Sequence, residues 1–137
     1  MTDLVCIDGA NRTGKTWLSH RIGASANGSV VVEAGAGDGV IAVAGAMNAV
    51  AVVVYDTAHP VPADFAARAL EGGFVPHLVT LVPHPSKVAE AVQAATAKKG
   101  FATFRVLCRE QNGWVDLAHS PGAHPNPQWL ACANTHF

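Results

Sequence analysis

The chain has 137 residues, of which 50% are apolar and 14% charged, and its formal net charge is -1 at pH 7. This length fits one domain, and so apolar a composition excludes a disordered chain because it supplies a buried core. The balanced charge argues against a dedicated nucleic-acid binder, which would carry a basic excess. We therefore expect one domain over residues 1–137, with its core at about 3–107 and a tail at 119–137.

The apolar runs are short, and the cysteines form no pattern. The longest run, at residues 49–55, is too short to cross a bilayer, and the N-terminus lacks the features of a signal peptide. Three cysteines at positions 6, 108 and 132 suggest no disulfide framework and fit a reducing compartment. The sequence therefore predicts a cytoplasmic protein with no membrane partner, and it is compatible with a homodimer.

Strand-like and helix-like segments alternate from residue 4 to about residue 100. In chain order, the pattern predicts a strand at 4–8, a helix at 16–23, a strand at 30–33, a loop at 34–39, a helix at 40–48, a strand at 49–55, a helix at 62–70, a strand at 78–82, and a helix that Ser86 caps and Gly100 ends. Residues 101–109 and 114–118 then flank Asn112-Gly113, which predicts a hairpin.

This alternation predicts the α/β class, with a mostly parallel β-sheet flanked by helices and a C-terminal β-hairpin. Ligands on such sheets bind beyond the carboxyl ends of the strands. We therefore expect functional residues directly after the strands, at 8–16, 33–39, 56–59 and 83–87.

Residues 9–16 match the phosphate-binding pattern G-x-x-x-x-G-K-[ST] in full, as Gly9-Ala10-Asn11-Arg12-Thr13-Gly14-Lys15-Thr16. The two glycines allow successive N–H groups to turn inward around a phosphate, and the next helix points its positive end there. In such loops the lysine reaches the β- and γ-phosphates, and the threonine hydroxyl ligates Mg²⁺. A chance match has a probability of roughly 0.3–0.4% at this composition, so we predict a P-loop of the NTPase type.

Polar residues follow three of the predicted strands. Asp56 ends the most apolar run, where it can hold Mg²⁺ or its water shell opposite Thr16, or merely turn the chain. Glu33 can accept hydrogen bonds from a sugar or hold a metal-bound water, or it can be a solvated loop acid. His59 can hydrogen-bond a phosphate or a water, or simply line a loop.

Four stretches, at residues 7–16, 30–35, 54–56 and 76–81, resemble the thymidylate kinases, within the nucleotide-kinase branch of P-loop proteins. The first is similar to that family's strand and P-loop, which typically reads E-G-x-D-R-x-G-K-S-T. Arg12 falls where the eukaryotic-type enzymes keep an arginine that assists phosphoryl transfer. The resemblance covers roughly residues 3–95. It implies ATP and Mg²⁺ as ligands and a small-molecule acceptor.

The chain departs from the family at several positions. Asn11 stands where the family has an acidic residue that contacts the substrate sugar. Val32 and Thr57 replace two arginines that help to bind the acceptor nucleotide. The lid and the long C-terminal helices look shortened or absent. The chain has no N-K-x-D motif, so ATP is the default donor over GTP.

Two hypotheses follow. In the first, a small kinase transfers the ATP γ-phosphoryl group to a nucleoside, nucleotide or similar acceptor, with Lys15 and Arg12 in catalysis and Asp8, Glu33 and His59 near the acceptor. In the second, the chain is a reduced, non-catalytic nucleotide-binding module that docks a partner. Arg105 and Arg109 share one face of the predicted hairpin and either reach the phosphates as a surrogate lid or lie on a solvated strand face.

Overall fold

The computed structural model describes residues 2–25, 30–32, 51–56, 60–111, 113–123, 127 and 130. The predicted loop at 34–39 and helix at 40–48 lie outside the described residues, as do Glu33 and His59. Within the described part of the chain, no helix combines the length and the apolar character needed to cross a membrane.

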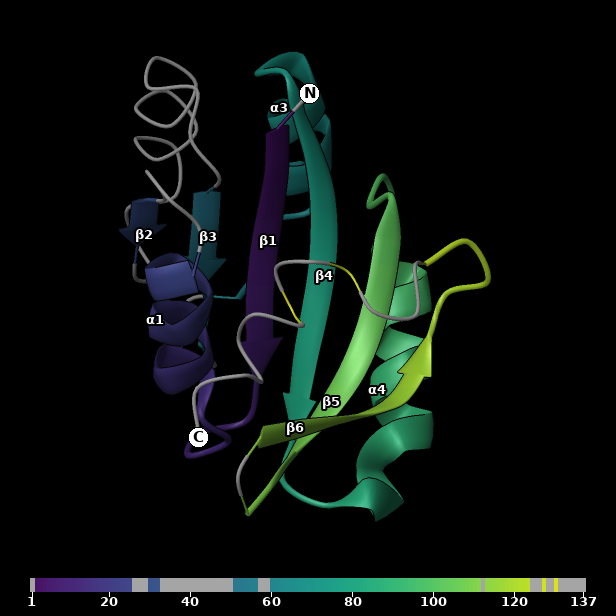
Figure 1. Cartoon of the computed structure of the whole chain (residues 1–137). Coiled ribbons are helices and arrows are strands. Elements are labelled where there is room, and N and C mark those ends of the chain that lie inside the picture. The colour runs from purple at the N-terminus through teal and green to yellow at the C-terminus, as the bar shows by residue number, and fades with distance from the viewer. Residues whose placement is uncertain are drawn as a thin grey trace.

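A six-stranded sheet forms the centre of the molecule, in the order β2-β3-β1-β4-β5-β6 (Figure 1). Its first five strands in this order run parallel, and β6 pairs antiparallel with β5. The α/β class is therefore confirmed, and the expected hairpin is present. The strands are β1 (Thr2–Gly9), β2 (Val30–Val32), β3 (Ala51–Val54), β4 (Phe74–Val82), β5 (Thr103–Glu110) and β6 (Gly113–His119).

Helices cover both faces of this sheet, with α1 (Lys15–Ser25) on one face and α3 (Phe65–Glu71) and α4 (Val88–Ala97) on the other (Figure 1). Because side chains alternate along a strand, β1 contributes to two separate cores. Ile7 packs with Leu18 and Ile22 of α1, whereas Cys6 packs with Phe65 of α3. The near-continuous apolar runs of β1 and β3 are thus explained by burial on both faces.

Most predicted boundaries lie within two residues of the observed ones, but three expectations were wrong, each for a local reason. The third predicted helix begins at Phe65 rather than residue 62, because Pro62 opens a turn in which its carbonyl accepts from the Phe65 N–H at 3.1 Å. Ser86 does not cap α4, because Lys87 occupies the N-cap position and Ser86 lies one residue earlier, in a short 3₁₀ turn, Pro85–Lys87, where its N–H donates to Nδ1 of His84. The strand predicted at 78–82 begins at Phe74, whose buried side chain extends the core.

The order of the strands reverses at β1. From β1 the chain passes to the edge strand β2, returns to β3 beside β1, and then continues in β4 on the other side of β1. In open α/β sheets, ligands bind outside the carboxyl ends of the strands at such a switch point. The segment that follows β1 is residues 9–16, so the fold puts the phosphate-binding pattern at this position.

Candidate functional site

The loop between β1 and α1 has the backbone that its glycines predict. Gly9 and Gly14 have φ angles of 138° and 93°, and Arg12 is also left-handed, at 63°. Left-handed residues next to right-handed ones turn consecutive N–H groups toward one point, which makes an anion-binding concavity. The Thr13 hydroxyl donates to the Ala10 carbonyl at 2.8 Å and closes the loop on itself.

Gly9 has a second reason to lack a side chain. A Cβ atom built on it would clash with the carbonyl oxygen of Leu81 in the neighbouring strand β4. The first glycine of the loop is therefore required for the packing of β1 against β4 as well as for its own backbone angles.

Lys15 begins α1, and its side chain folds back over the loop. Its Nζ donates to the carbonyls of Gly9 and Ala10 at 2.6 and 3.1 Å. An ammonium group has three N–H donors, so one of them is left for an anion. The Leu18 N–H donates to the Gly14 carbonyl at 2.8 Å and makes the first hydrogen bond of the helix. The first N–H groups of any helix have no acceptor within the helix itself, so this end of α1 can bind an anion.

A cavity of about 350 Å³ opens beside this loop and brings together residues from the loop, from α1 and from the end of β3. Thr16 and Asp56 both line it, so the hydroxyl and the carboxylate expected to serve Mg²⁺ share one space. These hard oxygen donors fit Mg²⁺, which protein sites bind through one or two carboxylates, phosphates and waters. The described lining residues are Asn11, Arg12, Gly14, Lys15, Thr16, Trp17, Val54, Tyr55 and Asp56.

Asp8 does not line that cavity. Its carboxylate accepts a hydrogen bond from the Thr80 hydroxyl at 2.6 Å and lies 3.8 Å from Nζ of Lys98. Burial raises the pKa of Asp8, while the Thr80 hydrogen bond and the positive charges of Lys98 and Lys15 act in the opposite direction. Of the three residues expected near an acceptor, Asp8 thus lies against Thr80 of β4 and Lys98 at the end of α4, and the other two are outside the described residues.

A second cavity of about 360 Å³ borders the same loop, on the side of β4 rather than of β3. Sequence reasoning did not find it, although strand-end residues at 83–87 were expected to be functional. Its walls come from elements that only the folded sheet brings together. They are Gly9, Ala10, Thr80, Leu81, Val82, Pro83, Lys87, Glu90 and Ala91.

The two hairpin arginines differ sharply, although both lie on the α1 face of β5. Arg105 is 2% exposed, and its Nη1 donates to Oδ2 of Asp116 at 2.8 Å, so it does not lie on a solvated face. Arg109 is exposed, and its guanidinium carbon lies 4.0 Å from the centroid of the Trp17 ring. The Trp17 ring in turn packs against Trp114 of β6, with 5.0 Å between the centroids.

No protein-family model matches this chain, and no curated protein matches it in sequence. A solved structure from the PezAT chromosomal toxin–antitoxin system of the human pathogen Streptococcus pneumoniae is similar in fold, with a TM-score of 0.59 at 11% identity. The match covers 95% of this chain and 77% of the other. At this identity the likeness concerns the fold alone.

Proposed function

We propose that this chain binds the triphosphate of ATP with Mg²⁺ through a P-loop at residues 9–16. The observation that carries the proposal is the loop itself: left-handed backbone at Gly9, Arg12 and Gly14 leads into a helix whose first residue, Lys15, lies over the loop carbonyls. The loop also follows the strand at which the sheet order reverses. A plain turn between a strand and a helix would need neither the lysine nor the threonine.

The activity that this site supports best is transfer of the γ-phosphoryl group to a nucleoside, nucleotide or similar small acceptor. Such transfer asks for positioning and charge neutralisation more than for covalent chemistry by the protein. Lys15 would hold the β- and γ-phosphates, and Arg12 would offer its fork to the group in transfer. Thr16 and Asp56 would hold Mg²⁺, which neutralises charge on the phosphates when bound.

A second function, nucleotide binding without efficient transfer, is favoured by the distribution of cations. Among the described residues that line the P-loop cavity, the only cations are Arg12 and Lys15, and both belong to the loop. An acceptor phosphate normally needs cationic partners of its own. In this alternative the chain is a nucleotide-dependent module that docks a partner.

Binding is tested by titration calorimetry with ATP and Mg²⁺ on the natural chain and on Lys15→Ala. Losing a charge-assisted contact should weaken ATP binding roughly tenfold or more. Arg68→Ala is the control, because it removes a cation on α3, whose charge is paired with Asp64. Equal affinity of Lys15→Ala and the natural chain would refute the P-loop assignment. ADP formation with candidate nucleosides and nucleotides then separates the enzyme from the module.

A further inference from the structure

The tip of the β5–β6 hairpin lies at the same end of the sheet as the loop between β1 and α1 (Figure 1). Arg109 sits near this tip, and its Cδ lies 3.5 Å from a Cβ built on Gly14. Its guanidinium stacks on Trp17, which lines the P-loop cavity. Arg109 therefore lies at the margin of the phosphate-binding loop, although it comes from the opposite end of the chain.

The surroundings of Arg109 are already positive. The N-terminal end of a helix carries partial positive charge, and a cation beside it is unfavourable unless an anion is present. The first turn of α1 has no acidic residue, and Lys15 is its first member. In the part of the chain that the structure describes, Arg109 forms no ion pair, and Asp56 is the one carboxylate that lines the cavity. This balance favours an anionic ligand.

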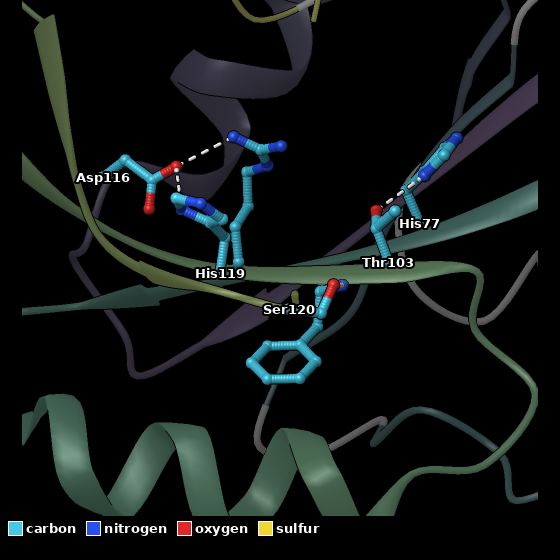
Figure 2. Close-up of polar contacts among 7 residues, drawn as sticks. His77, Thr103, Asp116, His119 and Ser120 are labelled. Atoms are coloured by element: carbon cyan, nitrogen blue, oxygen red, sulfur yellow. Dashed lines mark hydrogen bonds and ion pairs between the residues drawn. The ribbon is translucent and has the colours of Figure 1, made fainter. Parts of the chain in front are cut away.

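Arg105, on the same face of β5, provides a comparison, because its charge is paired with a carboxylate. Its partner, Asp116, also lies 3.4 Å from Nδ1 of His119, so one carboxylate oxygen holds two basic side chains of the hairpin (Figure 2). These contacts link β5 to β6 within the hairpin that carries Arg109. One arginine of the pair is thus used to build the hairpin, and the other is left charged and exposed at the loop.

We propose that Arg109 binds a phosphate group of the nucleotide held by the P-loop, with the Trp17 ring as the platform that aims it. A guanidinium keeps its charge, presents a fork that suits two phosphate oxygens, and stacks on aromatic faces without losing its N–H donors. The hairpin thus supplies from β5 a third cation, in addition to Arg12 and Lys15 of the loop. This inference rests on the proposed nucleotide binding.

The test is calorimetric titration of the whole chain with ATP and with ADP, each with Mg²⁺. Arg109→Gln should weaken the binding of both nucleotides roughly tenfold, and Arg109→Lys should weaken it less. The matched control is Arg21→Gln, which removes another arginine near Trp17, one whose guanidinium carbon is 5.8 Å from the ring centroid and which belongs to α1. Thermal melts check that each variant is folded, since Arg109 is exposed and Arg21 is half-buried.

The inference is overturned if Arg109→Gln binds both nucleotides as the natural chain does while Lys15→Ala does not. It is also overturned if Arg109→Gln and Arg21→Gln lose affinity equally, because the loss would then reflect total charge rather than a local contact. If the natural chain binds neither ATP nor ADP, the proposed nucleotide binding itself fails, and this inference fails with it.

Discussion

At the scale of single residues, Arg12 separates the two proposed functions. Its φ of 63° belongs to the left-handed region, which costs a residue with a side chain roughly 1–2 kcal/mol. A glycine would avoid this cost, so the arginine side chain needs a compensating role. A fork that bridges the phosphates as charge moves in the transition state would provide one.

We expect Arg12→Ala to lower phosphoryl-transfer turnover about 10³-fold or more while weakening ATP binding far less. The measurements are steady-state kinetics with the acceptor found to be active, and calorimetry with ATP. Arg12→Lys is the companion variant, since it keeps the charge and loses the fork. Turnover that survives Arg12→Ala unchanged would contradict a role in transfer, and a natural chain without turnover would leave the binding module as the function.

The first glycine of the loop can be tested separately from nucleotide binding. Gly9→Ala must place a Cβ against the backbone of β4 at a φ of 138°, so strain and clash add. We expect the free energy of unfolding to fall by roughly 2–5 kcal/mol, measured by urea denaturation. Gly73→Ala is the matched control, because its φ is 88° but nothing lies within 4 Å of the added Cβ. Its loss should be only roughly 1–2 kcal/mol. Equal losses of unfolding free energy for the two variants would show that the backbone of β4 shifts to accommodate the added Cβ at Gly9.

At the scale of elements, the β5–β6 hairpin depends on one ion pair. Arg105 is buried, and Asp116 is the partner that offsets the cost of burying its charge. Burial lowers the pKa of Arg105 because it disfavours the charged guanidinium. The negative charge and the hydrogen bond of Asp116 act in the opposite direction and favour the charged form. Removing the carboxylate would take from this buried guanidinium the ion pair, at 2.8 Å, that offsets its burial.

Asp116→Ala should therefore lower the free energy of unfolding by about 3–5 kcal/mol in a urea titration. Glu110→Ala, an exposed change on the same hairpin, should stay within about 0.5 kcal/mol of the natural chain. Asp116→Asn should fall between them, because its amide oxygen can still accept from Arg105. A loss for Asp116→Ala no larger than that for Glu110→Ala would mean that the hairpin is held by its packing alone.

The central strands β1 and β3 were easier to predict than the start of α3, and the reason is physical. β1 and β3 are buried on both faces, so their sequences are apolar without interruption and can be recognised locally. The start of α3 depends on whether Pro62 opens a turn or a helix, and the chain pattern allows both. The position of Ser86 suggested a cap, yet the 3₁₀ turn Pro85–Lys87 puts Lys87 rather than Ser86 at the N-cap position of α4.

At the scale of the whole molecule, the loop at 9–16 could be predicted because its chemistry is contiguous in sequence. The contact of Arg109 with Trp17 could not, because the two residues come from elements far apart in the sequence, β5 and α1, that only the folded chain brings together. The alternation of Arg105 and Arg109 with Leu107 correctly indicated one shared face, but not that one arginine would be buried and the other exposed. The distance between residues of two different elements depends on how the elements are arranged in the fold, and the local sequence pattern does not contain that information.

Ligand binding at the sheet's switch point should stabilise the entire domain, whichever of the two functions is correct. ATP with Mg²⁺ at one hundred times its Kd adds about 2.7 kcal/mol to the stability of the native state. With roughly 2.1 cal/mol/K of unfolding entropy per residue, a chain of 137 residues should then melt roughly 9 °C higher.

Differential scanning calorimetry measures this shift in Tm, and variants of the site resolve its origin. At the same ATP concentration, Lys15→Ala should lose about half of the shift, since a tenfold weaker complex adds about 1.4 kcal/mol less stability. The contribution of Mg²⁺ is the difference between the Tm shift with ATP and Mg²⁺ and the Tm shift with ATP and a chelator. Asp56→Asn should lose only this contribution, because an amide is a poorer Mg²⁺ ligand than a carboxylate. If ATP leaves the Tm of the natural chain unchanged with and without Mg²⁺, nucleotide binding is refuted. If Asp56→Asn keeps the full Mg²⁺-dependent part of the Tm shift, Asp56 does not bind Mg²⁺ and its role is only to turn the chain after β3.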